Sequence, residues 1–548
     1  MRLLIIGGVA AGTKAAARAR REYPDAEVTI VTQDEYVAYA GCGLPYFVGG
    51  EISEAKELIV RTPDEFKQEN GIDVLTRHQA LRIDPDRHEV LVRDLGTGTE
   101  KIFAYDKLII GTGALPLLPP IDGLQLKRVS TVRGLTDAKK IRALLNTGKL
   151  HRAVVIGGGF IGLEMAENLA RQGLTVSVVE LKSAILPGFD PEIAALAKNH
   201  LIEHGVQIYT GEAVTKLLGN EHGEVTAVVT DARTLEADLV ILSAGIRPNT
   251  DVAAAAGITV DKRGLILVDE YLRTNLPDIF AVGDCASVRN RLTGRDTYSP
   301  MGSTANKTGR LVVTNLFEPK EAFAGVQGTT IVRLFDLNAA RTGLSTEEAQ
   351  EAGFTVETVL VPTPDRAHYY PGNKLIITKL IADCATHRLL GAQVIGPGVV
   401  DKPIDTLALG IALGVTVEQL SGMDLAYTPP FASALSSSIV AANVMLNKFS
   451  GKLRGISPVA LHEEHPRAQL IDVRTEPEYL ISAIPGTVNI PLAELQEHLA
   501  ELDPERPVVT ICKVGRRAYT AALLLQRNGF RDVRILDGGM SAWPFETE

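Results

Sequence analysis

The sequence predicts an α/β protein of several domains, and three observations lead to this fold class. At 548 residues the chain is too long for one hydrophobic core, so three or four domains of ordinary size are expected. Aliphatic residues are plentiful while aromatic residues make up only 5%, which suits tightly packed layers of helices and strands. A strand, a glycine turn and a helix follow one another at residues 3–12, and the same pattern repeats at residues 153–162.

Charge and cysteine content exclude several classes of protein. The formal net charge of −10 is spread along the chain without long runs of one sign, so no nucleic-acid partner is expected. The chain has four widely and irregularly spaced cysteines: Cys42, Cys285, Cys384 and Cys512. This spacing argues against a disulfide framework and against a metal site, and it favours a reducing compartment. Because no uninterrupted apolar stretch is long enough to span a bilayer, we expect a cytoplasmic protein without a membrane partner.

The N-terminal glycine turn opens the first unit. Its order of charge, apolar run and small residues is also that of a signal peptide, but Gly7 and Gly8 interrupt the apolar run. Gly7 and Gly12 have the spacing of a dinucleotide-binding turn, although Val9 replaces the middle glycine. We therefore interpret residues 3–12 as a first strand and its turn, and predict a Rossmann-like domain.

The ligand of this first domain is predicted from later residues. Thr32 stands where a ribose-binding acid is expected, and Asp34 and Glu35 follow as substitutes. Asp284 stands at a helix start, where a carboxylate receives sugar hydroxyls, so FAD is the economical cofactor. The predicted FAD-binding residues are Gly7, Gly8, Gly12, Gly111, Thr112, Gly113, Asp284 and Ala305.

The second glycine turn is more regular. Gly157, Gly159 and Gly162 fit the G-x-G-x-x-G pattern, which brings a helix N-terminus up to a pyrophosphate. Glu180 ends the next strand, where an acid binds a ribose 2′-hydroxyl and repels a 2′-phosphate, so NADH is favoured. Lys182 nearby keeps NADPH as an alternative, and a plain surface role for Glu180 also stays open.

The repeated pattern indicates that the second unit is inserted in the first. We expect an FAD-binding domain at residues 1–150 and 246–327, and an NAD-binding domain at residues 151–245. Strands followed by an Ala/Leu-rich helical region predict a separate α+β domain at residues 328–447.

The C-terminal part changes composition. Polar residues at 448–455 predict a linker, and a short strand at residues 469–473 begins a last α/β domain at residues 456–548.

Cys42 has unusual neighbours. It lies between Gly41 and Gly43, which let the backbone approach a flat cofactor, and Pro45 orders the following turn. A buried packing thiol is the alternative, because free cysteine is commonly buried.

Residues 1 to about 447 resemble the flavin-dependent pyridine nucleotide-disulfide oxidoreductases. Relatives with a CxxxxC pair have a second cysteine at position 47, where this chain has Phe47. The resemblance therefore points to the single-cysteine branch, in which Cys42 cycles through a mixed disulfide, a persulfide or a sulfenic acid. This branch includes coenzyme A-disulfide reductases, NADH oxidases and peroxidases, and persulfide reductases.

Within this branch the chain is most similar to the coenzyme A-disulfide reductases, through GGVAAG, the CGLPY that begins at Cys42, HYYPG and AYTPP. The resemblance implies a dimerisation domain and a homodimer with Tyr369 and Tyr427 of one subunit beside Cys42 of the other. There a phenol can donate a proton to a departing thiolate. Arg18 and Arg21 share a helix face suited to the phosphates of coenzyme A, with a solvated basic face as the alternative.

Two residues depart from the pattern of these relatives. Around the cysteine, relatives that bind coenzyme A usually carry Ser and Asn, where this chain has Ala38 and Gly41. The pocket is therefore expected to be roomier, less selective for coenzyme A, or better suited to a small persulfide or polysulfide.

The last domain resembles a single rhodanese domain over about residues 456–545, through LIDVR, IPG, NIP, CKVGRRA and LDGG. Cys512 ends a strand and Arg517 begins a helix, so amides and guanidinium groups are expected to surround a persulfide sulfur. A phosphatase is the alternative, but its loop places five residues between Cys and Arg, and here four intervene. We interpret Asp472 and Arg474 as an ion pair within the domain.

These features together predict an NADH-dependent FAD enzyme that reduces coenzyme A persulfide, polysulfide or coenzyme A disulfide at Cys42. Cys512 is expected to deliver the sulfane sulfur. Phe160 either gates the flavin face or serves packing, and Cys285 and Cys384 are interpreted as structural. Two alternatives stay open: an NADH oxidase or peroxidase with Cys42 as a sulfenic acid, and a non-catalytic sulfur carrier or redox sensor.

Overall fold

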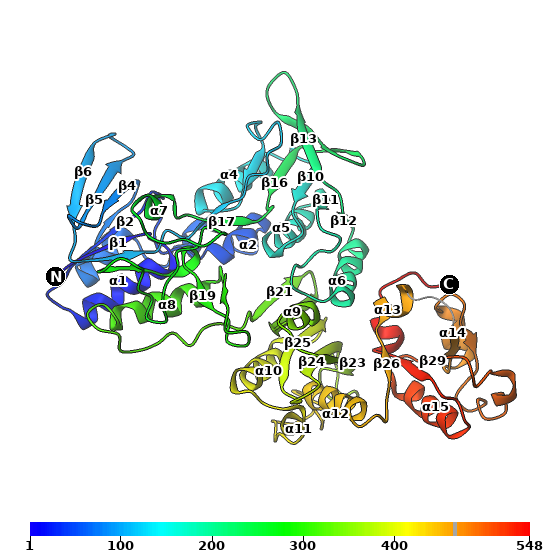
Figure 1. The fold of residues 1–548 in the computed structure, drawn as a ribbon. Coiled ribbons are helices and arrows are strands. Elements are labelled where there is room, and N and C mark those ends of the chain that lie inside the picture. The colour runs from blue at the N-terminus through cyan, green and yellow to red at the C-terminus, as the bar shows by residue number, and fades with distance from the viewer. Residues whose placement is uncertain (464–467) are drawn as a thin grey trace. The chain divides into compact units, whose positions relative to one another are not determined.

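The computed structural model describes residues 1–463 and 468–548, and its chain divides into two compact units (Figure 1). Unit 1 comprises Met1–Ser183 and Gly205–Val326, and unit 2 comprises Ala184–His204 and Gln327–Glu548. Each unit contains two five-stranded sheets. Both sheets of unit 1 are parallel, while unit 2 has one antiparallel and one parallel sheet. The predicted α/β fold class is confirmed. In the described part of the chain, no helix is both long and apolar enough to cross a membrane.

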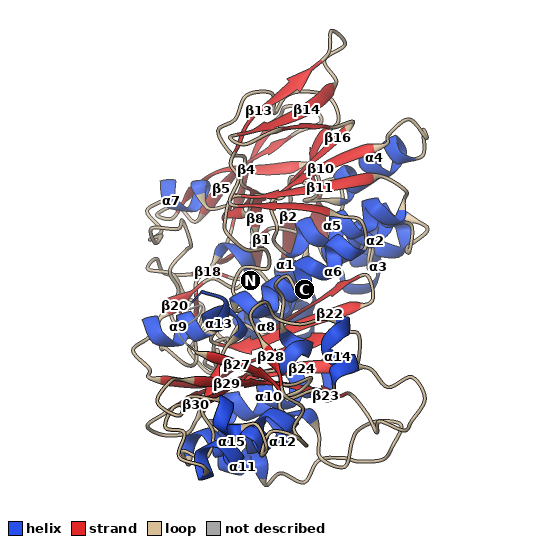
Figure 2. Ribbon diagram, turned by 90° about the vertical axis from the view of Figure 1, so that its right-hand side faces the viewer, coloured by secondary structure: helices blue, strands red, loops and turns tan. Residues whose placement is uncertain are grey.

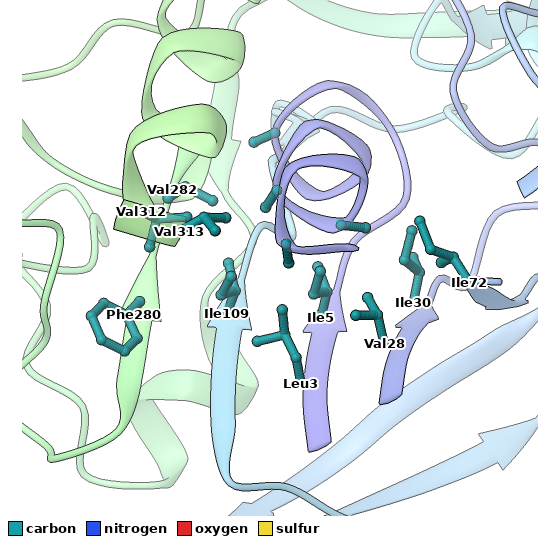
Figure 3. Close-up of a cluster of buried hydrophobic side chains, with 14 of the residues drawn as sticks. Leu3, Ile5, Val28, Ile30, Ile72, Ile109, Phe280, Val282, Val312 and Val313 are labelled. Atoms are coloured by element: carbon teal, nitrogen blue, oxygen red, sulfur yellow. The ribbon is translucent and has the colours of Figure 1, made fainter. Parts of the chain in front are cut away.

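The first parallel sheet of unit 1 lies beneath the N-terminal helix. Its strands, in spatial order, are β18 (Ile279–Ala281), β7 (Lys107–Ile110), β1 (Arg2–Ile6), β2 (Glu27–Val31) and β3 (Asp73–Leu75). Figure 3 shows Leu3, Ile5 and Ile109 beneath α1 (Ala10–Glu22), with Val312 and Val313 of α8 (Gly302–Thr314) beside them. Leu4 and Ile6 pack in a second cluster. Because both faces are covered, the interior residues of these strands are mostly apolar, while Arg2, Glu27 and Lys107 stand at strand starts.

Smaller elements complete this part of unit 1. An antiparallel sheet contains β4 (His78–Asp84), β5 (Glu89–Asp94) and β6 (Glu100–Ala104). Two strand pairs join β8 (Ala114–Pro116) to β17 (Ile246–Pro248), and β19 (Val288–Arg289) to β20 (Asp296–Thr297). The helices are α2 (Leu44–Gly49), α3 (Pro63–Asn70), α4 (Leu135–Leu145), α7 (Asp251–Ala255), and the 3-10 turns η1 (Gly41–Gly43), η2 (Ala55–Leu58) and η3 (Gly283–Cys285).

The second parallel sheet of unit 1 repeats the build of the first. Its order is β12 (Gln207–Thr210), β11 (Thr175–Glu180), β10 (Arg152–Ile156), β16 (Leu239–Leu242) and β9 (Val129–Thr131). The first turn amide, Gly7 N, donates to Val31 O at 2.8 Å, and its counterpart Gly157 N donates to Val179 O at 2.8 Å. The same β-turn-α-β unit therefore occurs twice. Helix α5 (Phe160–Arg171) and the antiparallel strands β13 (Val214–Gly219), β14 (Val225–Thr230) and β15 (Thr234–Glu236) complete it.

The antiparallel sheet of unit 2 forms the centre of the predicted α+β domain. Its order is β21 (Thr330–Leu334), β22 (Leu337–Gly343), β25 (Leu389–Gly396), β24 (Leu375–Asp383) and β23 (Val356–Pro364). The accompanying helices are α9 (Thr346–Glu351), α10 (Asp401–Leu413), α11 (Val417–Ser421) and α12 (Ser437–Phe449).

Helix α6 (Pro191–Glu203) also packs in unit 2, although its residues lie within the range 151–245 expected for the NAD-binding domain. The cause is a buried ion cluster. Lys379 of β24 forms ion pairs with Asp190 and with Glu192, whose Oε1 lies 2.5 Å from the ammonium nitrogen. Burying these charges is tolerable only because they neutralise one another, so α6 is tied to the sheet.

The last domain surrounds a parallel sheet (Figure 2). Its order is β26 (Gly455–Ile456), β30 (Val533–Leu536), β29 (Val508–Ile511), β27 (Gln469–Asp472) and β28 (Val488–Asn489). The helical segments are α13 (Pro458–Glu463), α14 (Glu476–Ile481), α15 (Arg516–Arg527), η4 (Leu499–Glu501) and η5 (Gly539–Ala542).

Two residues of the segment expected as a linker, Lys448 and Leu453, pack against neighbouring elements. Lys448 lies in α12, is buried, and donates to Asp537 Oδ2 at 2.8 Å and to Thr358 O at 2.7 Å. Leu453 belongs to the core of the last domain, and Gly455 begins β26. Ser450, Gly451, Lys452 and Arg454 are exposed, so the polar composition reflects a short surface segment between α12 and β26.

Replacing Lys448 with Met is expected to destabilise the last domain by about 3–5 kcal/mol, because the buried Asp537 carboxylate loses its compensating charge. Trp543, the sole tryptophan, lies in this domain, so its fluorescence during urea unfolding reports the change. Lys452→Ala, an exposed lysine nearby, is the control and should stay within about 0.5 kcal/mol. Equal stability of the two variants would contradict the assignment of the ion pair.

Candidate functional site

The two glycine turns share a close approach of backbone. Gly7 has φ +119°, and a Cβ on it would collide with Gly111 O; a Cβ on Gly12 would collide with Gly7 O. Gly157 has φ +113°, and a Cβ on Gly162 would collide with Gly157 O. Both turns therefore need glycine for backbone conformation and for helix-strand packing.

The helices that follow these turns begin without side-chain caps. Val9 precedes α1 and Gly159 precedes α5, and neither helix has a side-chain acceptor for its first amides. By contrast, Thr62, Ser345 and Thr416 cap α3, α9 and α11. Uncapped amides at the positive end of a helix fit a pyrophosphate group.

A cavity of about 260 Å³ opens beside the first turn in unit 1. Seven of the predicted FAD residues line it: Gly7, Gly8, Gly111, Thr112, Gly113, Asp284 and Ala305. Gly12 does not line it, but packs against Gly7 from within α1. The residues that the sequence scatters over three hundred positions thus meet at one edge of the sheet, as expected for parallel strands.

Asp284 is the carboxyl group of this cavity whose pKa is strongly raised. Burial raises the pKa of its carboxyl to about 6, and its Oδ1 has no hydrogen-bond partner among the described residues. A buried carboxylate oxygen without a partner is costly, so the site fits a ligand that brings hydroxyl donors. The sugar-like chain of FAD has such hydroxyls, and Asp284 would hold it there.

Sequence reasoning missed several residues of this cavity. Arg133 lines it and its Nη1 donates to Asp34 Oδ1 at 3.0 Å. Asp34, one of the two substitutes for the ribose-binding acid, therefore lies in the cavity wall, while the exposed Glu35 does not line it. His78 and Asn249 line it as well. They follow no glycine motif, so no local signal could have revealed them.

The second turn places Glu180 against the glycines. Glu180 Oε2 accepts a hydrogen bond from Gly158 N at 2.6 Å, and Oε1 accepts one from Lys182 N at 2.8 Å. The carboxylate is thus fixed where the ribose of a dinucleotide on this turn would lie. Phe160 is the first residue of α5 and is half-buried.

Cys42 lies in η1 and is exposed. Its neighbour Gly41 lines the cavity, while Phe47 is buried in α2. The hydroxyl of Tyr46 donates to Glu164 Oε1 of α5 at 3.1 Å and so connects α2 to the second turn. Partial loss of hydration raises the pKa of the Cys42 thiol, and the negative charges of Glu164 and Asp284 raise it further.

The two cysteines interpreted as structural differ in their exposure to solvent. Cys285 is buried, with its thiol 3.3 Å from Val282 O, in the core beneath the first sheet. Cys384 is exposed in the turn after β24, so its position does not support a packing role.

The predicted tyrosines and arginines lie at the surface of their units. Tyr369 and Tyr427 are 65% and 49% exposed, and a side-chain hydrogen bond between them raises the pKa of the Tyr369 phenol. Arg18 is held by Glu22 Oε1 at 2.5 Å and by Thr314 Oγ1 at 2.8 Å. Arg21 is exposed. Arg18 is therefore held by two side-chain contacts, while Arg21 is open to solvent, although both lie on α1.

Cys512 follows β29 and is buried. The amide of Gly515, which has φ +98° and precedes α15, donates to its Sγ at 3.1 Å. The guanidinium of Arg517 donates to both carboxylate oxygens of Glu478 at 2.6 and 2.8 Å, and it lies close enough to Cys512 for the two groups to interact electrostatically. This pairing lowers the pKa of Glu478 to about 2.

The expected ion pair of the last domain is present. Arg474 donates to Asp472 at 2.7 Å, and both side chains are buried. It holds the strand end next to the Cys512 loop, since Asp472 of β27 lies beside Ile511 of β29.

The fold and these sites fit a flavin-dependent, pyridine nucleotide-linked oxidoreductase joined to a further parallel α/β domain, and the matched families agree. Residues 1–306 match the pyridine nucleotide-disulphide oxidoreductases, residues 329–439 their dimerisation domain, and residues 458–545 the rhodanese-like domain. The chain belongs to the pyridine nucleotide-disulphide oxidoreductase family and carries a C-terminal rhodanese-like domain. This family implies FAD and NAD(P)H as cofactors.

Comparison with individual proteins indicates which members of this family the chain resembles. A NAD(P)H coenzyme A polysulfide/persulfide reductase of Pyrococcus horikoshii is 36% identical over 445 residues, which are 81% of this chain and 98% of that protein. The structure of a NAD-dependent persulfide reductase from A. fulgidus has 40% identity and a TM-score of 0.94, and covers 99% of this chain and 100% of its own. Reduced CoADR-RHD from Bacillus anthracis has 32% identity and a TM-score of 0.93, with coverages of 99% and 97%. The chain thus belongs with NAD(P)H-dependent persulfide, polysulfide or coenzyme A-disulfide reductases that carry a rhodanese domain.

Asp284→Ala should weaken FAD binding about 10- to 100-fold, because hydrogen bonds to a charged acceptor are lost. The flavin-free protein should not lose stability, since a buried carboxylate is removed. Flavin titration followed by protein fluorescence measures the affinity, and Asp261→Ala, outside the cavity, is the control. Unchanged affinity in Asp284→Ala would contradict the placement of FAD.

Glu478→Gln should remove a pH-dependent part of the stability of the last domain. The carboxyl has a folded pKa of about 2 against an ordinary 4.5, so its pairing with Arg517 stabilises fully above pH 4.5 and is lost as the pH falls through about 2. The melting temperature, followed by Trp543 fluorescence, should therefore differ between wild type and variant at pH 6 and converge near pH 2. A constant difference would show that the pair does not titrate as stated.

Proposed function

We propose that this protein catalyses the NADH-dependent reduction of small persulfides and polysulfides at Cys42, with coenzyme A persulfide preferred over polysulfide and coenzyme A disulfide. One observation carries the proposal. Cys42 is an exposed thiol beside the cavity that the predicted FAD residues line, and position 47 holds a buried phenylalanine instead of a resolving cysteine. A lone accessible thiol at such a site exchanges with an external sulfur compound.

The reaction balances as a two-electron reduction. NADH and one proton convert R–S–SH to R–SH and H₂S, with NAD⁺ as the other product. The Cys42 thiolate attacks the persulfide, HS⁻ leaves, and reduction of the resulting mixed disulfide releases R–S⁻ and restores the thiolate. When bound, FAD supplies the route by which the hydride of NADH becomes two electrons at sulfur.

Tyr369 and Tyr427 donate the protons in this proposal. The dimerisation domain indicates a homodimer, and the two phenols are exposed on it and joined by a hydrogen bond. A neutral phenol with a raised pKa keeps its proton until a thiolate leaves. Their place beside the Cys42 of the other subunit follows from the family resemblance.

The substrate class follows from the space around Cys42. A Cβ built on Gly41 meets no atom within 4 Å, and Ala38 offers no polar side-chain atom. Small inorganic polysulfides can therefore also reach Cys42, while coenzyme A persulfide gains a phosphate contact that Arg21 would provide.

Cys512 supplies the sulfane sulfur. The amide of Gly515 is aimed at its sulfur, and the positive end of α15 follows directly, so the terminal anionic sulfur of a persulfide would be stabilised. Support comes from the two structures that match nearly the whole chain, since both proteins combine the same parts.

The test is anaerobic NADH oxidation with coenzyme A persulfide, coenzyme A disulfide and inorganic polysulfide, with sulfide release measured in parallel. Persulfide or polysulfide should exceed the disulfide in kcat/KM by about tenfold, roughly 1.4 kcal/mol of transition-state preference. A preference for the disulfide would overturn the proposed substrate class. An NADH oxidase of Methanocaldococcus jannaschii is 33% identical over 453 residues, so oxygen consumption is the competing activity to record.

Substitutions distinguish the roles proposed for Cys42 and Cys512. Cys42→Ser should abolish sulfur-dependent NADH oxidation, while Cys512→Ser should spare small soluble substrates and impair those that need sulfur handed over. Cys384→Ser, which removes the other exposed thiol, is the control and should keep full activity. Equal loss of every activity in a folded Cys512→Ser variant would rule out the relay.

A further inference from the structure

Three potential metal ligands meet at one end of α6 in unit 2. His200 lies in the last turn of α6, His204 is its C-cap residue, and Asp336 lies in the turn between β21 and β22. Asp336 Oδ1 is 2.9 Å from His200 Nε2 and 3.5 Å from His204 Nε2. One atom of each side chain lies within 4.8 Å of the others.

These distances suit a tetrahedral metal ion. Zn²⁺ bonds to imidazole nitrogen and carboxylate oxygen at about 2.0–2.2 Å, which separates neighbouring donors by roughly 3.3 Å. The spacing of the two histidines also suits one ion, because residues four apart share a helix face. Asp336 is 69% exposed and the histidines are 16% and 36% exposed, so water can reach a fourth position.

The histidine rings are oriented for coordination. His204 Nδ1 lies 2.8 Å from His200 O, and because a carbonyl only accepts, Nδ1 carries the hydrogen. The free electron pair of the neutral ring is then on Nε2, which faces Asp336. Such a backbone contact on the opposite nitrogen is the usual support of a metal-bound histidine.

The turn that presents Asp336 is strained. Phe335 has φ +58°, a conformation that is rare for a bulky side chain, and its ring stacks on His204 with centroids 4.5 Å apart. Phe335 and Asp336 form the two-residue turn between the paired Leu334 and Leu337, and such turns require a positive φ, so the pairing of β21 with β22 compensates this strain and holds Asp336 in place. The negative end of α6 favours a cation at the same place.

We propose that His200, His204 and Asp336 bind one divalent transition-metal ion, Zn²⁺ by preference, which cross-links the end of α6 to the β21-β22 turn. The site has no part in the sulfur chemistry at Cys42. The spacing of the cysteines predicts no metal site, and Asp336 lies far from the two histidines in sequence.

Zinc binding tests the proposal on the full-length, FAD-loaded protein. After chelator treatment and desalting, equilibrium dialysis against Zn²⁺ should show one more bound ion per chain in the wild type than in His204→Gln or Asp336→Asn. Thiolates that bind Zn²⁺ contribute equally to all three proteins, so the difference belongs to this site. Zn²⁺ should also raise the melting temperature of the wild type by about 5 °C and leave the variants unchanged.

The matched control is His498→Ala, which removes an exposed histidine paired with Glu501 at 2.7 Å and should keep the full zinc content. If His204→Gln does not fold, the exposed Asp336→Asn carries the comparison. Equal zinc content in the wild type and the folded variants would overturn the proposal and identify the cluster as an ion pair of imidazolium and carboxylate.

Discussion

The close approach of backbone at the two glycine turns is the constraint on which unit 1 depends. Gly7 lets β1 turn directly beneath Gly111, and Gly12 lets α1 pack onto that turn. The helix therefore begins at the edge of the sheet, with amides that no side chain caps. Residues that follow neighbouring parallel strands are delivered to the same edge, so Asp284 lines the same cavity as Gly7, and Gly41 next to Cys42 also lines it.

Unit 2 depends on a different interaction, the neutralisation of buried charge. Lys379 holds the start of α6 against β24, and Lys448 holds the last sheet through Asp537. Each lysine would be prohibitively costly to bury alone, so these contacts fix which segments pack together. They tie α6 to the antiparallel sheet and the end of α12 to the last sheet.

The two cysteines that we propose to react differ in exposure and in the groups around their sulfur atoms. Cys42 is exposed, yet partial loss of hydration raises the pKa of its thiol, and the carboxylates of Glu164 and Asp284 raise it further. Cys512 is buried, and an amide already points at its sulfur. This difference suits the roles proposed for them, since a redox thiol must meet varied partners, while a sulfur carrier must protect one reactive atom. The pairing with Glu478 fixes the guanidinium of Arg517 near the carrier loop, where its positive charge interacts with Cys512.

The sequence by itself determined the fold class and the chemistry-bearing turns, because these depend on local patterns: glycines that no other residue can replace, apolar strands, and a lone cysteine at each site. It also identified seven of the residues that line the cavity and the Asp472–Arg474 pair. Only the tertiary structure decided the packing of α6, the exposure of Cys384, the partner of Arg517 and the meeting of His200 with Asp336. The physical reason is that such contacts join segments far apart in sequence, whose pairing follows from burial and charge and leaves no local pattern.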